Sequence, residues 1–262
     1  MKRRYRRGMV LRLIGCLAAL AIACGQAATL AEPSPTELLE KASANLTSAK
    51  TAHMDGTGSF AITSPLSISF DFKLSGDAEM PDKSRLTTQM SLLGQSLSID
   101  TITIGGRTFT KGLLGGDWTE AAADDQGAIT GAVLDPLGQI DLTAVATVTE
   151  IDRPEIDGRK TRHLSYVVDQ SKLLEKMKGS PTGAVPALTA SSAIGKGEVW
   201  IRTDDSQIVR QLVKVSIDMD GGLGIPGASP TAGSSTLEMS FDLRFSHIGE
   251  PISPTITAPP TK

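Results

Sequence analysis

An alternating stretch in the first third of the chain restricts the fold most strongly. From Leu66 to Ser75 every even position is apolar and every odd position is polar. Successive side chains of a β-strand point to opposite faces, so this period predicts a strand with one dry face and one wet face. Such a strand needs a sheet around it and a second layer over the apolar face.

Weaker patterns of the same kind predict further strands, about nine to eleven in all. Short turns such as Asp157-Gly158 join several of them, so we expect a mostly antiparallel sheet. The other predicted strands are Leu86–Leu92, Leu97–Ile104, Arg107–Lys111, Thr147–Asp152, Thr161–Val168, Glu198–Thr203, Ile208–Asp218 and Thr236–Ser246.

Few helices interrupt these strands. The first is predicted over Pro35–Ala49, where Leu38, Leu39, Ala42 and Leu46 form one apolar stripe. Two short helices are predicted over 136–142 and 170–178, the second with Asp169 as its N-cap. The stretches 180–193 and 221–234 are rich in Gly, Ala, Ser, Thr and Pro, and we expect flexible loops there.

The predicted fold class is therefore α+β and mainly β, with one large curved antiparallel sheet. Its apolar face can curl around the helices or fold onto itself as a sandwich. Aromatic residues are only 4% of the chain, so Leu, Ile, Val and Met supply many bulky positions. A cavity lined by such flexible side chains suits acyl chains, and an ordinary close-packed core fits the pattern equally well.

The N-terminus has the features of a secretory signal peptide. A cationic segment ends at Arg7 and an apolar run covers Leu13–Ala23, about half the length of a spanning helix. The sequence Ala21-Ile22-Ala23-Cys24 resembles the bacterial lipobox, in which the cysteine carries diacylglycerol. We expect cleavage before Cys24 and lipidation there, although an ordinary cleavage site remains the alternative.

The rest of the chain agrees with a lipid anchor at this cysteine. Cys24 has no disulfide partner after cleavage, because Cys16 is removed with residues 1–23. Two or more acyl chains give stable attachment. The expected order is a tether over 24–33, one domain over 34–249 and a Pro-rich extended tail over 250–262.

Charge and motifs argue against nucleic acid and against an enzyme. Cleavage leaves 20 basic and 29 acidic residues, a net charge of −9, whereas nucleic-acid binding relies on Lys and Arg. The three histidines have no metal spacing, and no G-x-S-x-G elbow or P-loop occurs. Asp218-Met219-Asp220-Gly221 resembles the beginning of a calcium loop, but the required third ligand and the distal Glu are missing. We therefore expect a non-catalytic protein without a metal or cofactor.

Short motifs spread along the whole mature chain carry a family resemblance through their order and spacing. The chain resembles the LppX/LprG-type lipoproteins, which share a fold with the LolA lipoprotein carriers. After the lipobox and the first helix, these motifs are Gly116-Asp117-Trp118, Leu134-Asp135-Pro136, Glu155-Ile156-Asp157-Gly158, Thr161-Arg162-His163-Leu164, Val199-Trp200-Ile201 and Gly249-Glu250-Pro251.

The resemblance implies a half-barrel wrapped around helices, with an apolar cavity that holds acylated lipid or glycolipid. It implies a monomer, anchored at the extracytoplasmic face of the cell membrane, that carries or presents lipid, with a membrane transporter or envelope protein as a further partner. A LolA-like sensor that binds an envelope protein without moving lipid is the alternative. The expected lining is Phe60, Ile62, Leu66, Ile68, Phe70, Phe72, Leu74, Met90 and Leu92, and for each of these core packing is the competing interpretation.

Overall fold

The computed structural model describes residues 32–63, 67–92, 95–112, 116–120, 145–172, 189–220 and 235–261. Pro35–Lys262 forms one compact unit, distinct from Met1–Ser34, and the fold below is that of the larger unit. The predicted signal peptide and Cys24 lie outside the described residues, as do the predicted helix over 136–142 and the stretch 221–234. Of the predicted helix over 170–178 only the first turn is described, and there Asp169 Oδ1 accepts a hydrogen bond from Lys172 N as an N-cap does.

Most of the described residues lie in one sheet of twelve strands. Its neighbours follow the order β6-β5-β4-β3-β2-β1-β12-β11-β10-β9-β7, and β8 pairs with β9. The strands are β1 (Thr51–Thr63), β2 (Ile68–Glu79), β3 (Lys83–Leu92), β4 (Gln95–Ile104), β5 (Arg107–Lys111), β6 (Thr119–Glu120), β7 (Val145–Asp152), β8 (Glu155–Ile156), β9 (Arg159–Val168), β10 (Thr189–Arg202), β11 (Ile208–Asp220) and β12 (Ser235–Ser246).

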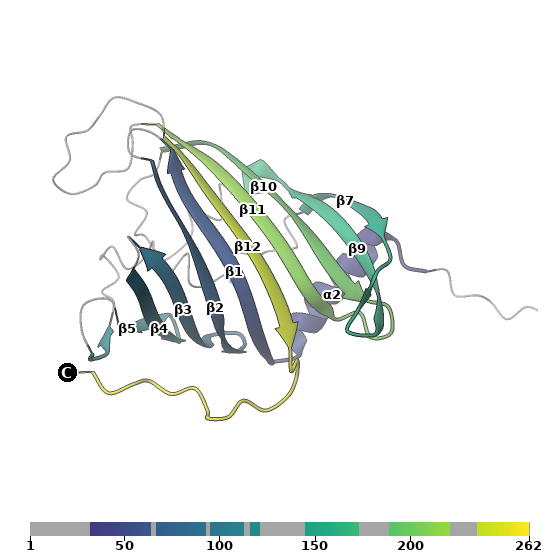
Figure 1. Cartoon of the computed structure of the whole chain (residues 1–262). Helices are drawn as coiled ribbons and strands as arrows, with labels where there is room; N and C mark the ends of the chain where they lie inside the picture. The colour runs from purple at the N-terminus through teal and green to yellow at the C-terminus, as the bar shows by residue number, and fades with distance from the viewer. Residues whose placement is uncertain are drawn as a thin grey trace, which may run out of the picture. The chain divides into compact units, whose positions relative to one another are not determined.

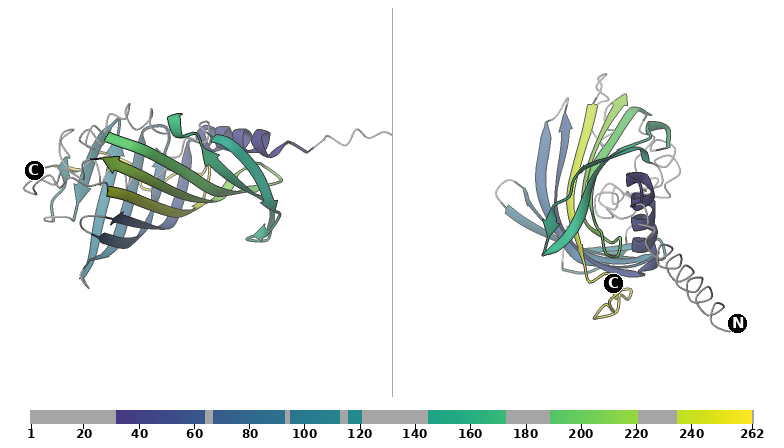
Figure 2. Two further views of the ribbon diagram at one scale, coloured as in Figure 1. Left: turned by 90° about the horizontal axis from the view of Figure 1, so that it is seen from above. Right: turned by 90° about the vertical axis from the view of Figure 1, so that its right-hand side faces the viewer.

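Every pair of neighbouring strands is antiparallel, which confirms the predicted fold class. Strands β1 to β6 extend the sheet in one direction from β1, and β12 returns to pair with the other side of β1 (Figure 1). The sheet curves, and helix α2 (Pro35–Ser48) lies on its concave side (Figure 2). We call the side that carries α2 the inner face and the opposite side the outer face.

Helix α2 forms because its apolar residues repeat at helical spacing. Leu38, Leu39 and Ala42 are buried in the main core, and Leu46 packs against the same cluster. The helix packs most closely on β7, β10 and β11. Near its end, Asn45 Nδ2 donates to the carbonyl oxygen of Asp205, at 3.0 Å, in the turn between β10 and β11. This bond fixes the helix against one half of the sheet.

The two-residue strands β6 and β8 were not predicted, and two long strands also differ from the sequence prediction. Strand β1 was not predicted, although Phe60 and Ile62 were assigned to the apolar face. Strand β10 begins at Thr189, so the predicted loop over 180–193 is wrong for its last residues. Both strands are rich in Gly, Ala and Ser, which have low intrinsic strand preference, and pairing with neighbouring strands places them in the sheet.

The C-terminal segment from Pro251 to Thr261 packs on the outer face of the sheet. It runs from the end of β12 back toward β5 (Figure 1). Ile256 is buried in a small apolar cluster with Ile102 and Phe109. Arg85 Nη1 donates to the carbonyl oxygen of Pro254 at 3.2 Å. The segment is extended, and apolar contacts hold it against β4 and β5.

Candidate functional site

The predicted apolar residues of β1 and β2 lie together on the inner face. Phe60 pairs with Phe70 in the register of these strands, and Phe72 and Leu74 follow on the same side of β2. Phe60, Phe72 and Leu74 are buried, with 6%, 3% and 3% of their surface exposed. Ile62 and Phe70 are partly exposed and pack against the same core, as does Met90 of β3.

The other predicted lining residues are less well placed or less fully described. Ile68 pairs with Ile62 and so shares its face, but it is 40% exposed at the beginning of β2. Leu66 lies outside the described residues. Leu92 pairs with Gln95 at the end of β3, and its side chain is not described. Lipid contact by any of these residues stays a prediction.

An aromatic cluster occupies the centre of the inner face. The rings of Phe60 and Phe70 are stacked with centroids 5.0 Å apart, and Phe72 meets Phe241 of β12 edge to face at 5.7 Å. Phe241 was not included in the predicted lining, although its strand was predicted. The alternation of Phe241, Leu243 and Phe245 along β12 was the signal that places it on this face.

Glycines on the inner face let these rings lie close to the backbone. A Cβ atom added to Gly58 of β1 would lie 2.2 Å from Phe72 Cζ, and one added to Gly197 of β10 would lie 2.5 Å from Tyr166 Cζ. Each ring therefore covers a glycine of the neighbouring strand. Gly58 pairs with Phe72 and Gly197 pairs with Tyr166, so each large ring has a partner without a side chain.

The polar side chains on the inner face fall into two groups, and one of them is fully paired. Gln211 of β11 is 1% exposed, and its Nε2 donates to the Tyr166 hydroxyl oxygen at 2.7 Å. Burial raises the pKa of Tyr166 to about 12. The phenol is therefore neutral over the physiological range, and this half of the inner face has no charge from it.

The second group is a set of threonines on β3, β4 and β5. Thr88 and Thr101 are 0% and 2% exposed, and neither hydroxyl oxygen has a hydrogen-bond partner. Thr110 of β5 pairs with Thr101 in the register, and its hydroxyl lies 3.5 Å from that of Thr119 on β6. The inner face thus changes from apolar over β1 and β2 to a mixture over β3 to β6, where these hydroxyls lie among apolar side chains such as Ile99.

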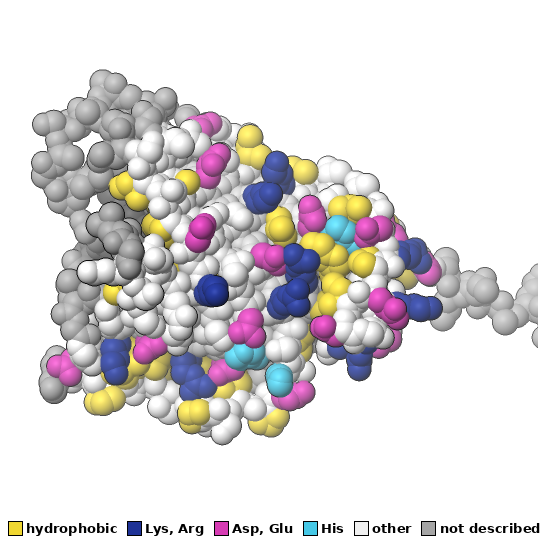
Figure 3. Space-filling view, in the orientation of Figure 1, with side chains coloured by type: hydrophobic (Ala, Val, Ile, Leu, Met, Phe, Trp, Pro, Cys, Tyr) yellow, Lys and Arg dark blue, Asp and Glu magenta, His cyan; other side chains and the backbone are white. Residues whose placement is uncertain are grey.

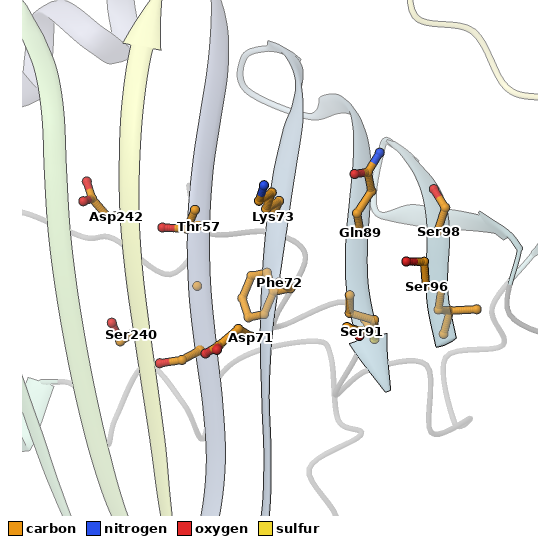
Figure 4. Close-up of a pocket in the computed structure, with 14 residues that line it drawn as sticks. Thr57, Asp71, Phe72, Lys73, Gln89, Ser91, Ser96, Ser98, Ser240 and Asp242 are labelled. Carbon is orange, nitrogen blue, oxygen red and sulfur yellow. The ribbon is translucent and has the colours of Figure 1, made fainter. Parts of the chain in front are cut away.

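The outer face carries an open polar groove of about 840 Å³ (Figure 4). It crosses β12, β1, β2, β3 and β4. Two residues of the predicted lining, Phe72 and Met90, also border it, although both belong to the inner-face row of their strands. This groove is not the predicted apolar cavity, which stays a prediction. The polar lining residues are Thr57, Ser59, Asp71, Lys73, Gln89, Ser91, Ser96, Ser98, Ser240 and Asp242.

A row of stacked side chains lies beside this groove on the outer face. The His163 ring stacks on Trp200 with centroids 4.1 Å apart, and the Arg210 guanidinium lies 4.5 Å from the Trp200 ring centre. Arg210 also donates two hydrogen bonds to Asp242, at 2.8 and 2.6 Å, which hold the pKa of that carboxyl below its usual value. Basic and acidic side chains are interspersed over the coloured part of this face (Figure 3).

Two histidines have carboxylates at both ring nitrogens. His163 Nδ1 lies 3.0 Å from Asp152 and its Nε2 lies 2.9 Å from Glu198. His53 Nδ1 lies 2.7 Å from Asp77, and its Nε2 also faces an aspartate. A nucleophile activated by histidine needs a hydroxyl or thiol at one ring nitrogen, and these positions are taken by acids. Within the described part of the chain, no group of three or more His, Cys, Asp or Glu side chains is arranged to hold a metal ion.

Comparisons with known proteins found similar solved structures. LprF from Mycobacterium bovis is 18% identical, with 87% of this chain and 99% of that chain covered and a TM-score of 0.46. Lipoprotein LppX from Mycobacterium tuberculosis is 17% identical, with coverages of 86% and 100% and a TM-score of 0.42. A LolA superfamily protein from Nitrosomonas europaea is 9% identical, with coverages of 81% and 93% and a TM-score of 0.27.

LprF and LppX are of the type that the sequence motifs resemble. No family model matches the chain, and no curated protein matches its sequence. The fold assignment rests on the strand order and register of this chain. Among the residues described, no helix is long and apolar enough to cross a membrane.

Proposed function

We propose that the chain is a lipoprotein that binds acylated lipid or glycolipid on its inner face and carries or presents it in the cell envelope. One observation carries the proposal: the apolar inner face extends well beyond the strands on which α2 packs most closely. Partly exposed apolar side chains mark this extension, namely Ile62, Phe70, Met90, Leu237 and Met239.

The chemistry of this extension suits acyl chains. Methionine side chains are flexible and adapt to irregular apolar partners, and Met90 and Met239 lie on both sides of the aromatic cluster. Removing one methylene from water contributes roughly 0.8 kcal/mol. Half of a sixteen-carbon chain therefore contributes about 6 kcal/mol before the cost of ordering it. Contact with a few inner-face side chains is enough to hold a lipid.

The anchor restricts where this binding takes place. Diacylglycerol on Cys24 would hold the chain at the extracytoplasmic face of the cell membrane. The residues between Cys24 and Ser34 reach about 30 Å when fully extended. The domain would therefore take up or present lipid close to its own membrane and pass it to a transporter or another envelope protein. No catalytic step is part of the proposal.

Lipid binding is tested by native mass spectrometry of a chain that starts at Gly25, since Pro35–Lys262 forms a compact unit. We expect a bound species with the mass of an acylated lipid. Phe70→Asp should reduce loading while circular dichroism stays unchanged, because Phe70 is only partly buried. Ser69→Asp is the matched control, since Ser69 is exposed on the same strand. The proposal fails if the wild-type chain carries no lipid and takes up none from phosphatidylglycerol vesicles.

Anchoring is tested separately on the full chain. Cys24→Ser should move the protein from the membrane fraction to the soluble fraction, and mass spectrometry of the wild type should find diacylglycerol on Cys24. A wild-type protein that is soluble and has an unmodified cysteine would contradict the anchor without affecting lipid binding.

A further inference from the structure

Two buried hydroxyls on the inner face lack the partner that burial normally demands. Among the described residues, Thr88 Oγ1 and Thr101 Oγ1 are the buried side-chain atoms without a hydrogen bond. A buried hydroxyl without a partner lowers the stability of the fold, because it has lost its hydrogen bonds to water and gained none in return. The protein therefore maintains two polar groups at a cost to its own stability, which is explained if a ligand supplies the acceptors.

Thr88 and Thr101 lie where the apolar part of the inner face meets the part that carries hydroxyls. Thr88 pairs with Leu74 on the apolar side, and Thr101 pairs with Thr110 on the side lined by hydroxyls. Phe72 and Met90 form the next pair along β2 and β3. A molecule that lies across this boundary meets apolar side chains on β1 and β2, and on β3 to β6 it meets hydroxyls that alternate with apolar side chains such as Ile99.

The other buried polar pair on this face does not lack hydrogen-bond partners. Gln211 and Tyr166 are hydrogen-bonded to each other at 2.7 Å. The inner face thus satisfies this polar pair on β9 and β11 and leaves the two threonine hydroxyls open on β3 and β4. This difference indicates where the polar part of a ligand lies.

We propose that Thr88 and Thr101 donate hydrogen bonds to the ester carbonyl oxygens of the bound acylated lipid. The inference rests on the proposed function and sets the orientation of the ligand. Thr88 pairs with Ile99, so Thr101 is its diagonal neighbour on β4, roughly 7–8 Å away. That spacing favours two acceptors over one, as the esters of two adjacent acyl chains provide. The acyl chains lie over β1 and β2, and the headgroup lies toward β5 and β6.

The test compares an ester lipid with an ether lipid that lacks only the carbonyl oxygens. The chain from Gly25 is titrated with dipalmitoyl phosphatidylglycerol and with its dihexadecyl ether analogue. Two hydrogen bonds of ordinary net strength give the wild type about a tenfold preference for the ester. In the Thr88→Val, Thr101→Val double variant this preference should disappear, while binding of the ether lipid stays unchanged.

Two controls separate this role from a structural one. The double variant should be at least as resistant to urea as the wild type, because it removes unpaired hydroxyls. Thr87→Val, on the same strand but facing outward and bonded to Asp100, should keep the full ester preference. Equal binding of both lipids by the wild type overturns the inference, as does an ester preference that survives in the double variant. In either case lipid binding itself stands, whereas a chain that binds neither lipid overturns the proposed function and this inference together.

Discussion

The close approach of Phe72 to Gly58 predicts a specific loss of stability when a methyl group is added. In Gly58→Ala the new Cβ would lie 2.2 Å from Phe72 Cζ and 2.6 Å from Cε2, so the ring must move. That ring is packed edge to face on Phe241, which limits its freedom. Overpacking of this kind costs about 1–3 kcal/mol, and the loss of glycine's flexibility in the unfolded chain returns about 0.4–1 kcal/mol. We expect a net decrease of about 1–2 kcal/mol in the free energy of unfolding.

Urea unfolding followed by circular dichroism measures this decrease. Gly116→Ala is the control, because an added Cβ there has nothing within 4 Å, and it should stay within about 0.5 kcal/mol of the wild type. Shortening the ring should relieve the clash, so Phe72→Leu and Gly58→Ala together should cost at least about 0.5 kcal/mol less than the sum of the two. A stable Gly58→Ala variant, or strictly additive effects, would refute the packing of Phe72 over Gly58.

Three further predictions concern the polar and apolar contacts. The raised pKa of Tyr166 means that its contribution to the free energy of unfolding is complete below pH 10 and is lost as the pH rises through about 12. Urea unfolding at increasing alkaline pH should show a decrease on the order of 2 kcal/mol in the wild type. This decrease should be absent in Tyr166→Phe. The lowered pKa of Asp242 means that its stabilisation is present above its ordinary value of 3.8 and is lost as the pH falls below it; Asp242→Asn should therefore lose less stability than the wild type in acid unfolding. Ile256→Ala empties a site beside Phe109 and should lower the free energy of unfolding by about 2 kcal/mol, and an unchanged urea midpoint would contradict the packing of the C-terminal segment.

The main features of the fold could be predicted because they depend on local periodicity. The alternation from Phe70 to Leu74 placed one strand and its buried face, and the helical stripe around Leu38 and Leu39 placed α2. In each case the side chains themselves carry the pattern that the structure uses. The antiparallel sheet follows from several such strands joined by short turns.

Two long strands were missed or shortened because partners far along the chain determine them. Strand β1 contains Gly56 and Gly58, whose inner-face neighbours on β2 and β12 are Leu74, Phe72, Leu243 and Phe241. Taken alone, the segment has too few bulky residues to predict a strand. Only the pairing with large side chains on both sides explains the glycines.

The burial of the outer face near β5 could not be predicted from the sequence pattern either. Alternation identifies two faces of a strand, but it does not identify which of them another segment covers. Ile102 and Phe109 are buried on the outer face because Ile256, far along the chain, packs against them. The inner face of the same strands carries threonines together with Ile99. The unpaired hydroxyls of Thr88 and Thr101 could be recognised only once the sheet register was known.

Lipid binding by the inner face can be measured as lipid uptake by a pair of variants on strand β2. The chain from Gly25 is incubated with phosphatidylglycerol vesicles, separated from them and weighed by native mass spectrometry. We expect bound lipid in the wild type and in Ser69→Asp, and reduced loading in Phe70→Asp at unchanged circular dichroism. A wild-type chain without lipid, or equal loading of Phe70→Asp and Ser69→Asp, would contradict lipid binding by the inner face.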